Sequence, residues 1–382
     1  MKVALVYDRV NKWGGAERLL LVLHELFPNA PLYTSVYNPK TAPWASVFNV
    51  KTSFLNNFPF AALSHEYYAL LMPLAFESFS FDDYDLVISI SSEAAKGIVT
   101  KPKTFHLCYC LTPTRYLWSG YNEYFANSSV RVLSKPAVSY LKNWDLIAAQ
   151  RADAYIAISK EVKDRIKKYY GREAEVVYPP VTILNPKSEI PFGPSFHSDE
   201  SSERAGRGRN SKQSQNTKYY LVVSRLVPYK RIDIAIEACN KLKLPLVVIG
   251  TGSEEKKLKH IGGSTITFVG SLTDAELVEY YKGCRALIFP GKEDFGLTVL
   301  EAQSFGKPVI AFKGGGTLET VIEGKTGEFF SRQTVDSLVA LLKNFNGQKY
   351  SIKDCLKNAQ KYSKQKFKRE FMKIVQHLVY AL

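Results

Sequence analysis

Strand-like apolar runs alternate with amphipathic helical runs along nearly the whole chain, and this alternation limits the folds that the chain can adopt. It is typical of parallel β-sheets covered by helices on both faces. The fold class that follows is α/β, with Rossmann-like sheets. The expected strands lie at residues 3–7, 86–89, 105–109, 154–158, 219–224, 246–249, 266–269, 286–289 and 308–312. The clearest helices of the first half are expected at residues 16–27, 136–151 and 160–169.

A chain of 382 residues exceeds one ordinary hydrophobic core, so we expect two domains. The boundary is expected at Pro179 and Pro180, because paired prolines exclude helix and suit a hinge. The final residues 350–382 are expected to be helical and basic. The expected parts are an N-terminal Rossmann-like domain at residues 1–178, a hinge with a basic and polar insertion at 179–218, a C-terminal Rossmann-like domain at 219–364, and a C-terminal helix at 365–382 that packs back on the first domain.

The formal net charge of +15 is compatible with nucleic acid, an anionic membrane surface or phosphorylated substrates. The basic residues are dispersed and show no helix-turn-helix, zinc-finger or RNA-binding signature, which argues against nucleic acid. Residues 192–217 have almost no apolar content, so we expect a disordered surface insertion there. A solvated loop is favoured over an acidic lipid surface as the environment of its basic residues, Arg204, Arg207, Arg209 and Lys212.

The numbers and spacing of the cysteines and histidines limit which cellular compartment and which metal sites are compatible with the sequence. The five cysteines are an odd number without zinc-ligand spacing, which favours a reducing compartment. The six histidines never pair at metal-ligand spacing, so we expect no metal site built by the protein and no cofactor. No apolar run of about 18 residues is present to span a bilayer, and residues 1–8 read as a strand rather than a signal peptide. We expect a cytoplasmic protein, with peripheral association at the inner membrane face left open.

Two glutamates, Glu293 and Glu301, flank a glycine-bearing turn in the C-terminal third of the chain. The apolar run 286–289 ends at Pro290, and helical composition starts a few residues later, so residues 291–296 are expected to link a strand to a helix. Glu301 would accept hydrogen bonds from a ribose diol, and Glu293 would face a transferred group. The first backbone N–H groups of the helix would suit a phosphate, namely those of Gly296, Leu297 and Thr298.

Open parallel sheets bind ligands outside the carboxyl ends of their strands, which directs attention to the loops after strands. Arg225 and Lys230 follow the expected strand 219–224 beside a helix start. Two cations there suit a diphosphate and would stabilise the charge that develops on a departing nucleotide, with solvated surface charge as the alternative. Gly14 and Gly15, after the first strand, allow either a close approach of the backbone to a ligand or a simple tight turn.

Two further glycine-bearing loops follow strands. In the loop at residues 250–252 the third glycine of a dinucleotide fingerprint is absent, and the following Ser253-Glu254-Glu255 looks like a helix cap and an acidic first turn. We interpret this loop as mainly structural. The loop at residues 313–317 offers backbone for close approach, with a plain turn as the equal alternative.

Taken together, these segments resemble the retaining glycosyltransferases of family 4, the glycosyl transferases group 1. Such enzymes have the GT-B architecture, in which two Rossmann-like domains face each other across an active-site cleft. The resemblance covers both domains and favours mannosyltransferase-like relatives. It rests on residues 14–17, the segment 112–118, the Tyr178-Pro179-Pro180 hinge, Ser224-Arg225 with Lys230-Arg231, and Glu293 with Glu301.

The resemblance implies a role for each matched residue. Arg225 and Lys230 would hold the donor diphosphate, Glu301 the ribose and Glu293 the hydroxyls of the donor sugar, while Gly15 would border the diphosphate. Glu293, Arg225 and Lys230 are the expected catalytic residues. Further donor contacts are expected from Phe295, Gly296, Leu297 and Thr298. The acceptor-side residues would be Arg115, Tyr116 and Trp118.

The resemblance further implies transfer of a hexosyl group, mannose favoured, to a glycan or lipid-linked glycan in cell-surface polysaccharide biosynthesis. The donor would be GDP-mannose or, less favoured, a UDP-sugar, and retention would need no divalent metal. One departure stands out, because many relatives carry histidine where this chain has Leu111. Leucine can neither hydrogen-bond the sugar nor stabilise positive charge. A non-catalytic scaffold that binds a nucleotide sugar or a glycan is therefore the alternative.

Overall fold

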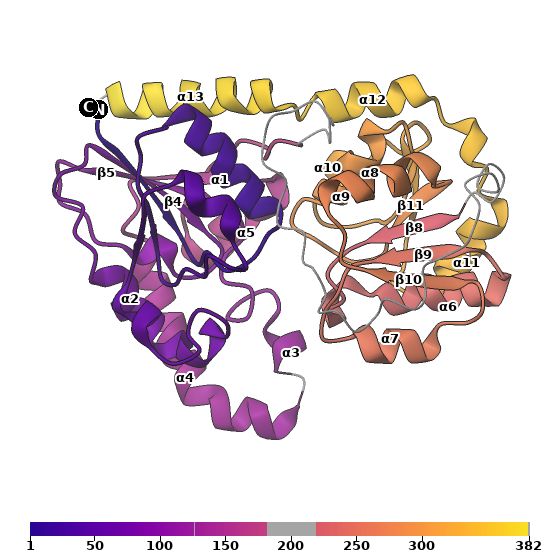
Figure 1. The fold of residues 1–382 in the computed structure, drawn as a ribbon, viewed down its shortest axis with the longest axis horizontal. Coiled ribbons are helices and arrows are strands. Elements are labelled where there is room, and N and C mark those ends of the chain that lie inside the picture. Colours follow the sequence, from indigo (N-terminus) through magenta and orange to yellow (C-terminus); the bar gives the residue numbers. More distant parts are fainter. Residues whose placement is uncertain (126, 182–218, 381–382) are drawn as a thin grey trace. The chain divides into compact units, whose positions relative to one another are not determined.

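The computed structural model describes residues 1–125, 127–181 and 219–380 (Figure 1). The chain divides into two compact units, one made of Met1–Thr182 and Tyr362–Leu382 and the other of Ile183–Lys361. The insertion expected at residues 192–217 lies outside the described residues.

The first unit is built on a seven-stranded parallel sheet with the order β3-β2-β1-β4-β5-β6-β7. Its central strands are buried along their whole length, which explains their uninterrupted apolar runs. The short strands β2, β3 and β7 were not predicted, because two or three residues are too few to show a period. The strands are β1 Val3–Tyr7, β2 Leu32–Thr34, β3 Val50–Thr52, β4 Leu86–Ser91, β5 Phe105–Cys110, β6 Ala154–Ala157 and β7 Glu175–Val176.

Helices cover this sheet, and short 3-10 helices lie between its strands. Ala4 and Val6 of β1 and Val87 of β4 share one core with Met72 and Phe76 of α2. The α-helices are α1 Gly15–Leu26, α2 Met72–Glu77, α3 Tyr121–Tyr124, α4 Ser128–Ala148, α5 Lys160–Tyr170 and α13 Lys364–Tyr380. The 3-10 helices are η1 Pro43–Val47, η2 Phe54–Asn57, η3 His65–Leu71 and η4 Ala95–Gly97.

The start of α4 differs from the prediction. We expected a helix from Pro136, since proline is favoured in a first helical turn. The helix begins earlier, at Ser128, and contains Pro136 in its interior. Its true start is set by Asn127, whose side chain accepts hydrogen bonds from the N–H groups of Ser129 and Val130 at 2.9 and 3.3 Å.

The second unit is built on a six-stranded parallel sheet with the order β10-β9-β8-β11-β12-β13. Side chains of β11 alternate between its faces: Ile288 packs with α6 and α11, whereas Leu287 and Phe289 pack with α8 and α9. Strand β13 was not predicted, because Gly-Glu-Phe-Phe offers no apolar run. The strands are β8 Tyr220–Val223, β9 Leu246–Ile249, β10 Ile266–Gly270, β11 Ala286–Phe289, β12 Val309–Phe312 and β13 Gly327–Phe330. The helices are η5 Pro228–Lys230, α6 Ile232–Leu242, α7 Glu255–Ile261, α8 Asp274–Gly283, α9 Leu297–Ser304, α10 Thr317–Thr320, α11 Val335–Asn344, η6 Gly347–Lys349 and α12 Ile352–Gln360.

The C-terminal residues form two helices that belong to different units, not one continuous helical segment. Helix α12 is part of the second unit, and α13 is part of the first, where Figure 1 shows it beside α1. Phe367 and Phe371 of α13 lie against Tyr109 of β5, each with ring centroids 6.1 Å from it. Lys364 and Lys368 bind Glu25 of α1 at 3.0 and 2.6 Å. The units part between Lys361 and Tyr362, slightly before the expected boundary at 364.

Throughout residues 1–125, 127–181 and 219–380, no helix combines the length and apolar content needed to cross a bilayer.

A buried histidine lies between two strands of the first sheet. The His106 side chain on β5 is fully buried, and its Nε2 shares a hydrogen bond of 2.8 Å with the Ser89 hydroxyl on β4. Burial lowers the pKa of His106 to about 3, because the charged imidazolium would lose its hydration. The ring is therefore neutral in the folded protein at all but strongly acidic pH.

We predict that His106 makes the folded protein less stable in mild acid. An unfolded histidine has a pKa of about 6.5, so between roughly pH 6.5 and 3 the unfolded state binds the extra proton. The free energy of unfolding should fall by up to about 1.4 kcal/mol per pH unit lost over this range. His106→Gln should make urea midpoints less dependent on pH. Ser89→Ala, which keeps the histidine, should retain the dependence; equal slopes for His106→Gln and the parent would contradict the prediction.

Candidate functional site

Three loops of the second unit meet at the carboxyl edge of its sheet, because β8, β11 and β12 are neighbours. The loop after β11 lies against the loop after β12, where the Gly316 N–H donates to the Glu293 carbonyl oxygen at 2.9 Å. A Cβ at Gly316 would lie 2.3 Å from the Cα of Phe295, so only glycine allows this approach. The loop after β8 reaches the same place through Lys230, whose backbone borders Gly291.

Lys230 and Glu293 form an ion pair within this group of loops. Their side chains are 12% and 18% exposed, so the pair is shielded but not sealed from solvent. The Lys230 ammonium also lies 5.3 Å from the centre of the Tyr229 ring. Arg225 is exposed and donates a hydrogen bond of 2.8 Å to the Tyr229 hydroxyl. The structure thus brings together the expected catalytic residues from two separate loops.

Helix α9 begins directly beside this pair. Gly296 is its N-cap, with a φ of 90° that favours glycine. The first-turn N–H groups of Leu297 and Thr298 have no intrahelical acceptor, as at every helix start. One turn further on, Glu301 is buried, and its Oε2 accepts a hydrogen bond of 2.7 Å from the Tyr281 hydroxyl. A helix start, a cation and carboxylates therefore share one edge of the sheet.

The loop at residues 250–252 is packed against the loop after β8. Leu226 donates its N–H to the Thr251 carbonyl oxygen, and Glu254 donates its N–H to the Leu226 carbonyl oxygen, both at 2.9 Å. These backbone contacts are consistent with a structural role for the loop. The N-cap of α7 is Glu254, so the expected cap at Ser253 is wrong by one residue.

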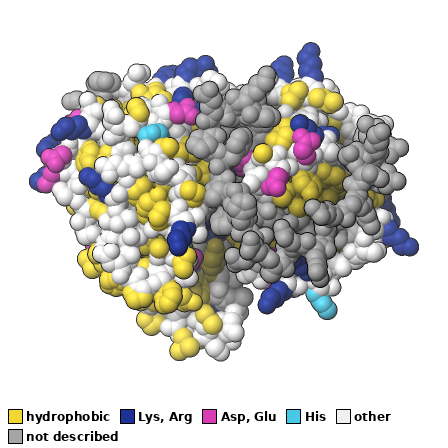
Figure 2. Space-filling view, in the orientation of Figure 1, with side chains coloured by type: hydrophobic (Ala, Val, Ile, Leu, Met, Phe, Trp, Pro, Cys, Tyr) yellow, Lys and Arg dark blue, Asp and Glu magenta, His cyan; other side chains and the backbone are white. Residues whose placement is uncertain are grey.

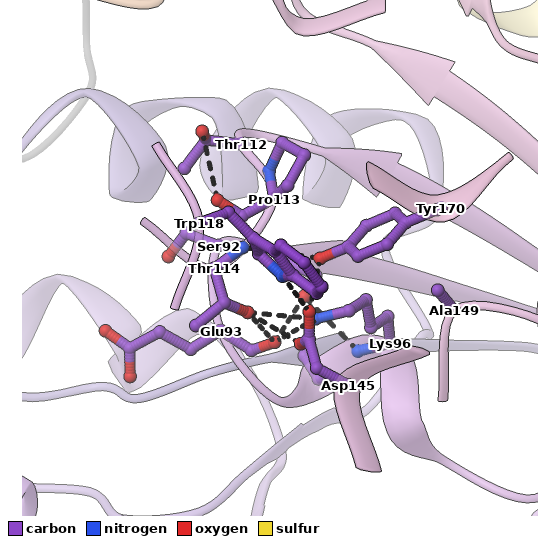
Figure 3. Close-up of polar contacts among 12 residues, drawn as sticks. Ser92, Glu93, Lys96, Thr112, Pro113, Thr114, Trp118, Asp145, Ala149 and Tyr170 are labelled. Carbon is purple, nitrogen blue, oxygen red and sulfur yellow. Dashed lines mark hydrogen bonds and ion pairs between the residues drawn. The ribbon is translucent and has the colours of Figure 1, made fainter. Parts of the chain in front are cut away.

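In the first unit, polar side chains converge on Asp145, which lies on α4 (Figure 3). Its Oδ1 accepts from the Lys96 ammonium at 2.5 Å and from the Thr114 hydroxyl at 2.7 Å. Its Oδ2 accepts from the Trp118 indole at 2.7 Å and from the Tyr170 hydroxyl at 2.8 Å. The Lys96 and Asp145 side chains are each 1% exposed, so this carboxylate is satisfied entirely by protein groups.

Lys96 is satisfied as well. Besides Asp145, its ammonium donates to the Glu93 carbonyl oxygen at 2.5 Å and to the Thr114 hydroxyl at 3.1 Å. Burial alone would lower the pKa of Lys96, but the nearby Asp145 carboxylate outweighs burial and raises it. The lysine therefore stays charged and holds this buried network together.

The network anchors the segment 112–118, from which acceptor contacts were expected. Trp118 uses its indole N–H on Asp145 and stacks on Tyr169 with ring centroids 5.2 Å apart. Arg115 and Tyr116 are half-buried on the same segment. Leu111, just before it, is half-buried and donates its N–H to the Ser91 carbonyl oxygen at 2.8 Å.

The remaining expected site residue, Gly15, opens α1 in the first unit. Nearby, Glu17 of the same helix is buried and accepts a hydrogen bond of 2.6 Å from the Tyr7 hydroxyl at the end of β1. Gly15 and the three acceptor-side residues therefore lie in the first unit, whereas all other expected site residues lie in the second.

Sequence reasoning missed a second polar cluster at the carboxyl ends of β1 and β4. Buried Asp8 accepts from the N–H groups of Ser92, Glu93 and Ala95 at 2.7, 3.0 and 2.8 Å. Burial raises the pKa of Asp8. Arg9 binds Glu93 at 2.6 Å. The position of Asp8 and Arg9 in the sequence could have indicated this cluster, because both residues directly follow the first expected strand.

In the described part of the chain, no group of three or more His, Cys, Asp or Glu side chains is arranged to hold a metal ion. All five cysteines are free and buried.

Part of the chain, mostly within the second unit, matches a known family. Residues 207–362 match the family described as Glycosyl transferases group 1. The chain is 31% identical over 130 residues to the O-antigen chain mannosyltransferase C of Escherichia coli, covering 32% of this chain and 34% of that protein. It is 25% identical to the alpha-1,3/1,6-mannosyltransferase ALG2 of Dictyostelium discoideum, covering 81% of this chain and 79% of that one.

Solved structures resemble the chain over its whole length. The HepE protein of Anabaena, in complex with UDP-glucose, has a TM-score of 0.70 at 19% identity and covers 99% of this chain and 100% of its own. Sucrose-phosphate synthase of Thermosynechococcus elongatus has a TM-score of 0.68 at 14% identity and covers 100% of both chains. At such identities the likeness shows the fold, and the α/β class with two parallel sheets is confirmed as that of GT-B glycosyltransferases.

The curated relatives are matched over only part of their length. The alignment covers 34% of the Escherichia coli protein and 56% of an uncharacterized glycosyltransferase from Methanocaldococcus jannaschii, which is 25% identical over 224 residues. These partial alignments therefore support a shared domain, and they do not establish that the chain has the activity of the whole relatives.

We predict that the first unit depends on the Lys96–Asp145 pair for stability. Lys96→Met should lower the free energy of unfolding by about 3–5 kcal/mol, because it leaves a buried carboxylate without its cation. Urea unfolding followed by circular dichroism measures this change. Lys101→Met is the matched control, since Lys101 pairs with Asp82 at the surface and its loss should cost no more than about 1 kcal/mol. Equal losses in both variants would contradict the prediction.

Proposed function

We propose that the chain is a retaining glycosyltransferase of family 4. It transfers a hexosyl group, mannose favoured, from a nucleotide sugar to a glycan or lipid-linked glycan acceptor in cell-surface polysaccharide biosynthesis. The observation that carries the proposal is the Lys230–Glu293 pair at the start of α9, inside the segment that matches the glycosyltransferase family.

The charges at this edge suit a nucleotide diphosphate. Lys230 and Arg225 supply cations, and the first turn of α9 supplies N–H groups for phosphate oxygens. When a donor binds, its diphosphate takes over Lys230, and Glu293 becomes available to the sugar hydroxyls. The Glu301 carboxylate, fixed by Tyr281, would hold the ribose. The structures of HepE in complex with UDP and with UDP-glucose support a nucleotide-sugar donor.

The reaction can proceed on one face of the sugar. The bond between the anomeric carbon and the diphosphate oxygen breaks, and the acceptor oxygen bonds to the same carbon. The acceptor hydroxyl proton passes to the departing diphosphate. Lys230 and Arg225 stabilise the negative charge that collects on the leaving group, so the mechanism needs no divalent metal.

The acceptor is assigned to the first unit, through Arg115, Tyr116 and Trp118. Mannose and GDP-mannose are favoured because the Escherichia coli and Dictyostelium relatives are named mannosyltransferases. A polysaccharide role is consistent with the O-antigen name of the first of these. We place the enzyme in the cytoplasm and at the inner membrane face.

A second function is favoured by Leu111, which stands where many such enzymes carry histidine. The chain would then be a scaffold that binds a nucleotide sugar or a glycan without turnover. Calorimetric titration with GDP-mannose and UDP-glucose, alongside an assay for released nucleotide, separates the two functions. Binding without release in the presence of candidate acceptors would favour the scaffold.

We predict that Lys230→Met lowers kcat/KM for the favoured donor by about 10²–10³-fold, since one fixed stabiliser of the leaving group is lost. Glu293→Gln should bind the free nucleotide diphosphate as the parent does yet transfer poorly, because its contact is with the sugar. Lys282→Met is the control, as Lys282 lies on the surface of α8 and pairs with Glu279. Full transfer by an Arg225→Ala/Lys230→Ala double variant would rule the assignment out.

We predict that removing divalent metal leaves donor binding and transfer unchanged, because cationic side chains do the work at the diphosphate. Titration and assay with and without EDTA test this. Loss of activity in EDTA that added Mg²⁺ or Mn²⁺ restores would show that a metal takes part.

A further inference from the structure

The outer face of α4 is apolar, although it is turned away from the core. Val138, Leu141, Asp145 and Ala148 form its buried side. On the opposite side, the exposed fractions are 71% for Val132, 82% for Leu133, 51% for Tyr140 and 60% for Ile147. Positions 132, 136, 140 and 147 recur at helical spacing, so these side chains and Pro136 form one stripe. From Val132 to Ile147 the stripe is about 22 Å long at 1.5 Å per residue.

The charged side chains of α4 outside its buried face are all basic, with Lys135 exposed and Arg131 and Lys142 half-buried. Arg131, Lys135 and Lys142 lie along the helix, and Asp145 is its only acidic residue. Asp145 is buried, with its carboxylate used by Lys96, Thr114, Trp118 and Tyr170. The helix therefore presents an apolar stripe and positive charge without a surface carboxylate of its own.

The 3-10 helix η3 lies beside the buried side of α4 and exposes apolar side chains of its own. Ala69 of η3 packs against the cluster that contains Val138 and Leu141, which places η3 next to the helix. The neighbours of Ala69 are exposed: Tyr67 by 84% and Leu70 by 49%. Figure 2 shows hydrophobic side chains gathered over the part of the first unit where Figure 1 places α4. We call the outer face of α4, over residues 130–147, the α4 surface.

We propose that the α4 surface docks on an anionic membrane, with α4 lying in the plane of the lipid headgroups. An amphipathic helix with a basic flank binds by burying its apolar side chains while its lysines and arginines meet anionic headgroups. Tyr140 suits this boundary, because tyrosine has an apolar ring and a polar tip. The net charge of +15 adds to the attraction.

A second copy of the chain fits this surface less well. In a symmetric dimer the same patch meets itself, so Arg131 and Lys135 would face the equivalent cations of the other copy. No carboxylate on the surface of α4 is present to pair with them. An anionic lipid layer satisfies the same charges along the whole helix. The proposal is independent of the glycosyltransferase assignment, since it concerns binding in the absence of any donor.

Flotation of the full chain with vesicles tests the proposal. The protein should float with vesicles of phosphatidylcholine and phosphatidylglycerol, and much less with phosphatidylcholine alone. Val132→Ser/Leu133→Ser should weaken binding by at least about tenfold, because two apolar side chains lose their burial in lipid. Arg131→Gln/Lys135→Gln should weaken it by about fivefold per charge. Ile352→Ser, which changes a 65% exposed isoleucine of the second unit, should bind as the parent does.

Two controls keep the outcome clear. Circular dichroism and a melting midpoint establish that each variant is folded, which the exposure of the substituted side chains favours. Sedimentation equilibrium establishes the state of association. Binding that is unchanged in the α4 variants, or absent in the parent, would overturn the proposal. A dimer of the parent that Val132→Ser/Leu133→Ser dissociates, without any loss of vesicle binding, would assign the surface to a second copy instead.

Discussion

The arrangement of the first unit depends on one carboxylate. Asp145 joins α4 to the residues after β4 through Lys96, to the segment after β5 through Thr114 and Trp118, and to the end of α5 through Tyr170. A buried charge is tolerated only when it is paired and fully hydrogen-bonded. If one of these elements moved alone, Asp145 would lose a hydrogen-bond partner while still buried, which is energetically costly. Asp145 therefore holds the proposed acceptor segment in place through Thr114 and Trp118, and its role is structural.

The second unit positions its charges by a different means. Its loops touch backbone to backbone, as at Gly316, and the Lys230–Glu293 pair stays within reach of solvent. A sealed pair such as Lys96–Asp145 is suited to holding a structure, because breaking it is costly. A partly exposed pair is suited to exchanging partners, because water and a ligand can replace either member. Burial thus separates a structural ion pair from one that a substrate can use.

Much of the fold was predictable from local pattern, because buried parallel strands leave apolar runs. Strands β1, β9 and β11 were predicted with their observed bounds. Strands of two or three residues, such as β3, carry too little pattern, and β13 has no apolar run. The interior Pro136 misled the predicted start of α4. At the site, the loops after strands drew attention to Lys230 and Glu293. Asp145 was beyond reach, since its partners lie 25 to 49 residues away and nothing local marks them.

The place of α13 has a consequence for how the protein is made. The helix covers Tyr109 of the first unit, yet it follows the whole second unit along the chain. During synthesis on the ribosome, part of the apolar surface of the first sheet stays uncovered until the second unit and α13 have been synthesised. Domains usually fold in the order of their synthesis. Here the second unit can complete its core first, and the N-terminal residues finish folding only after α13 has been synthesised.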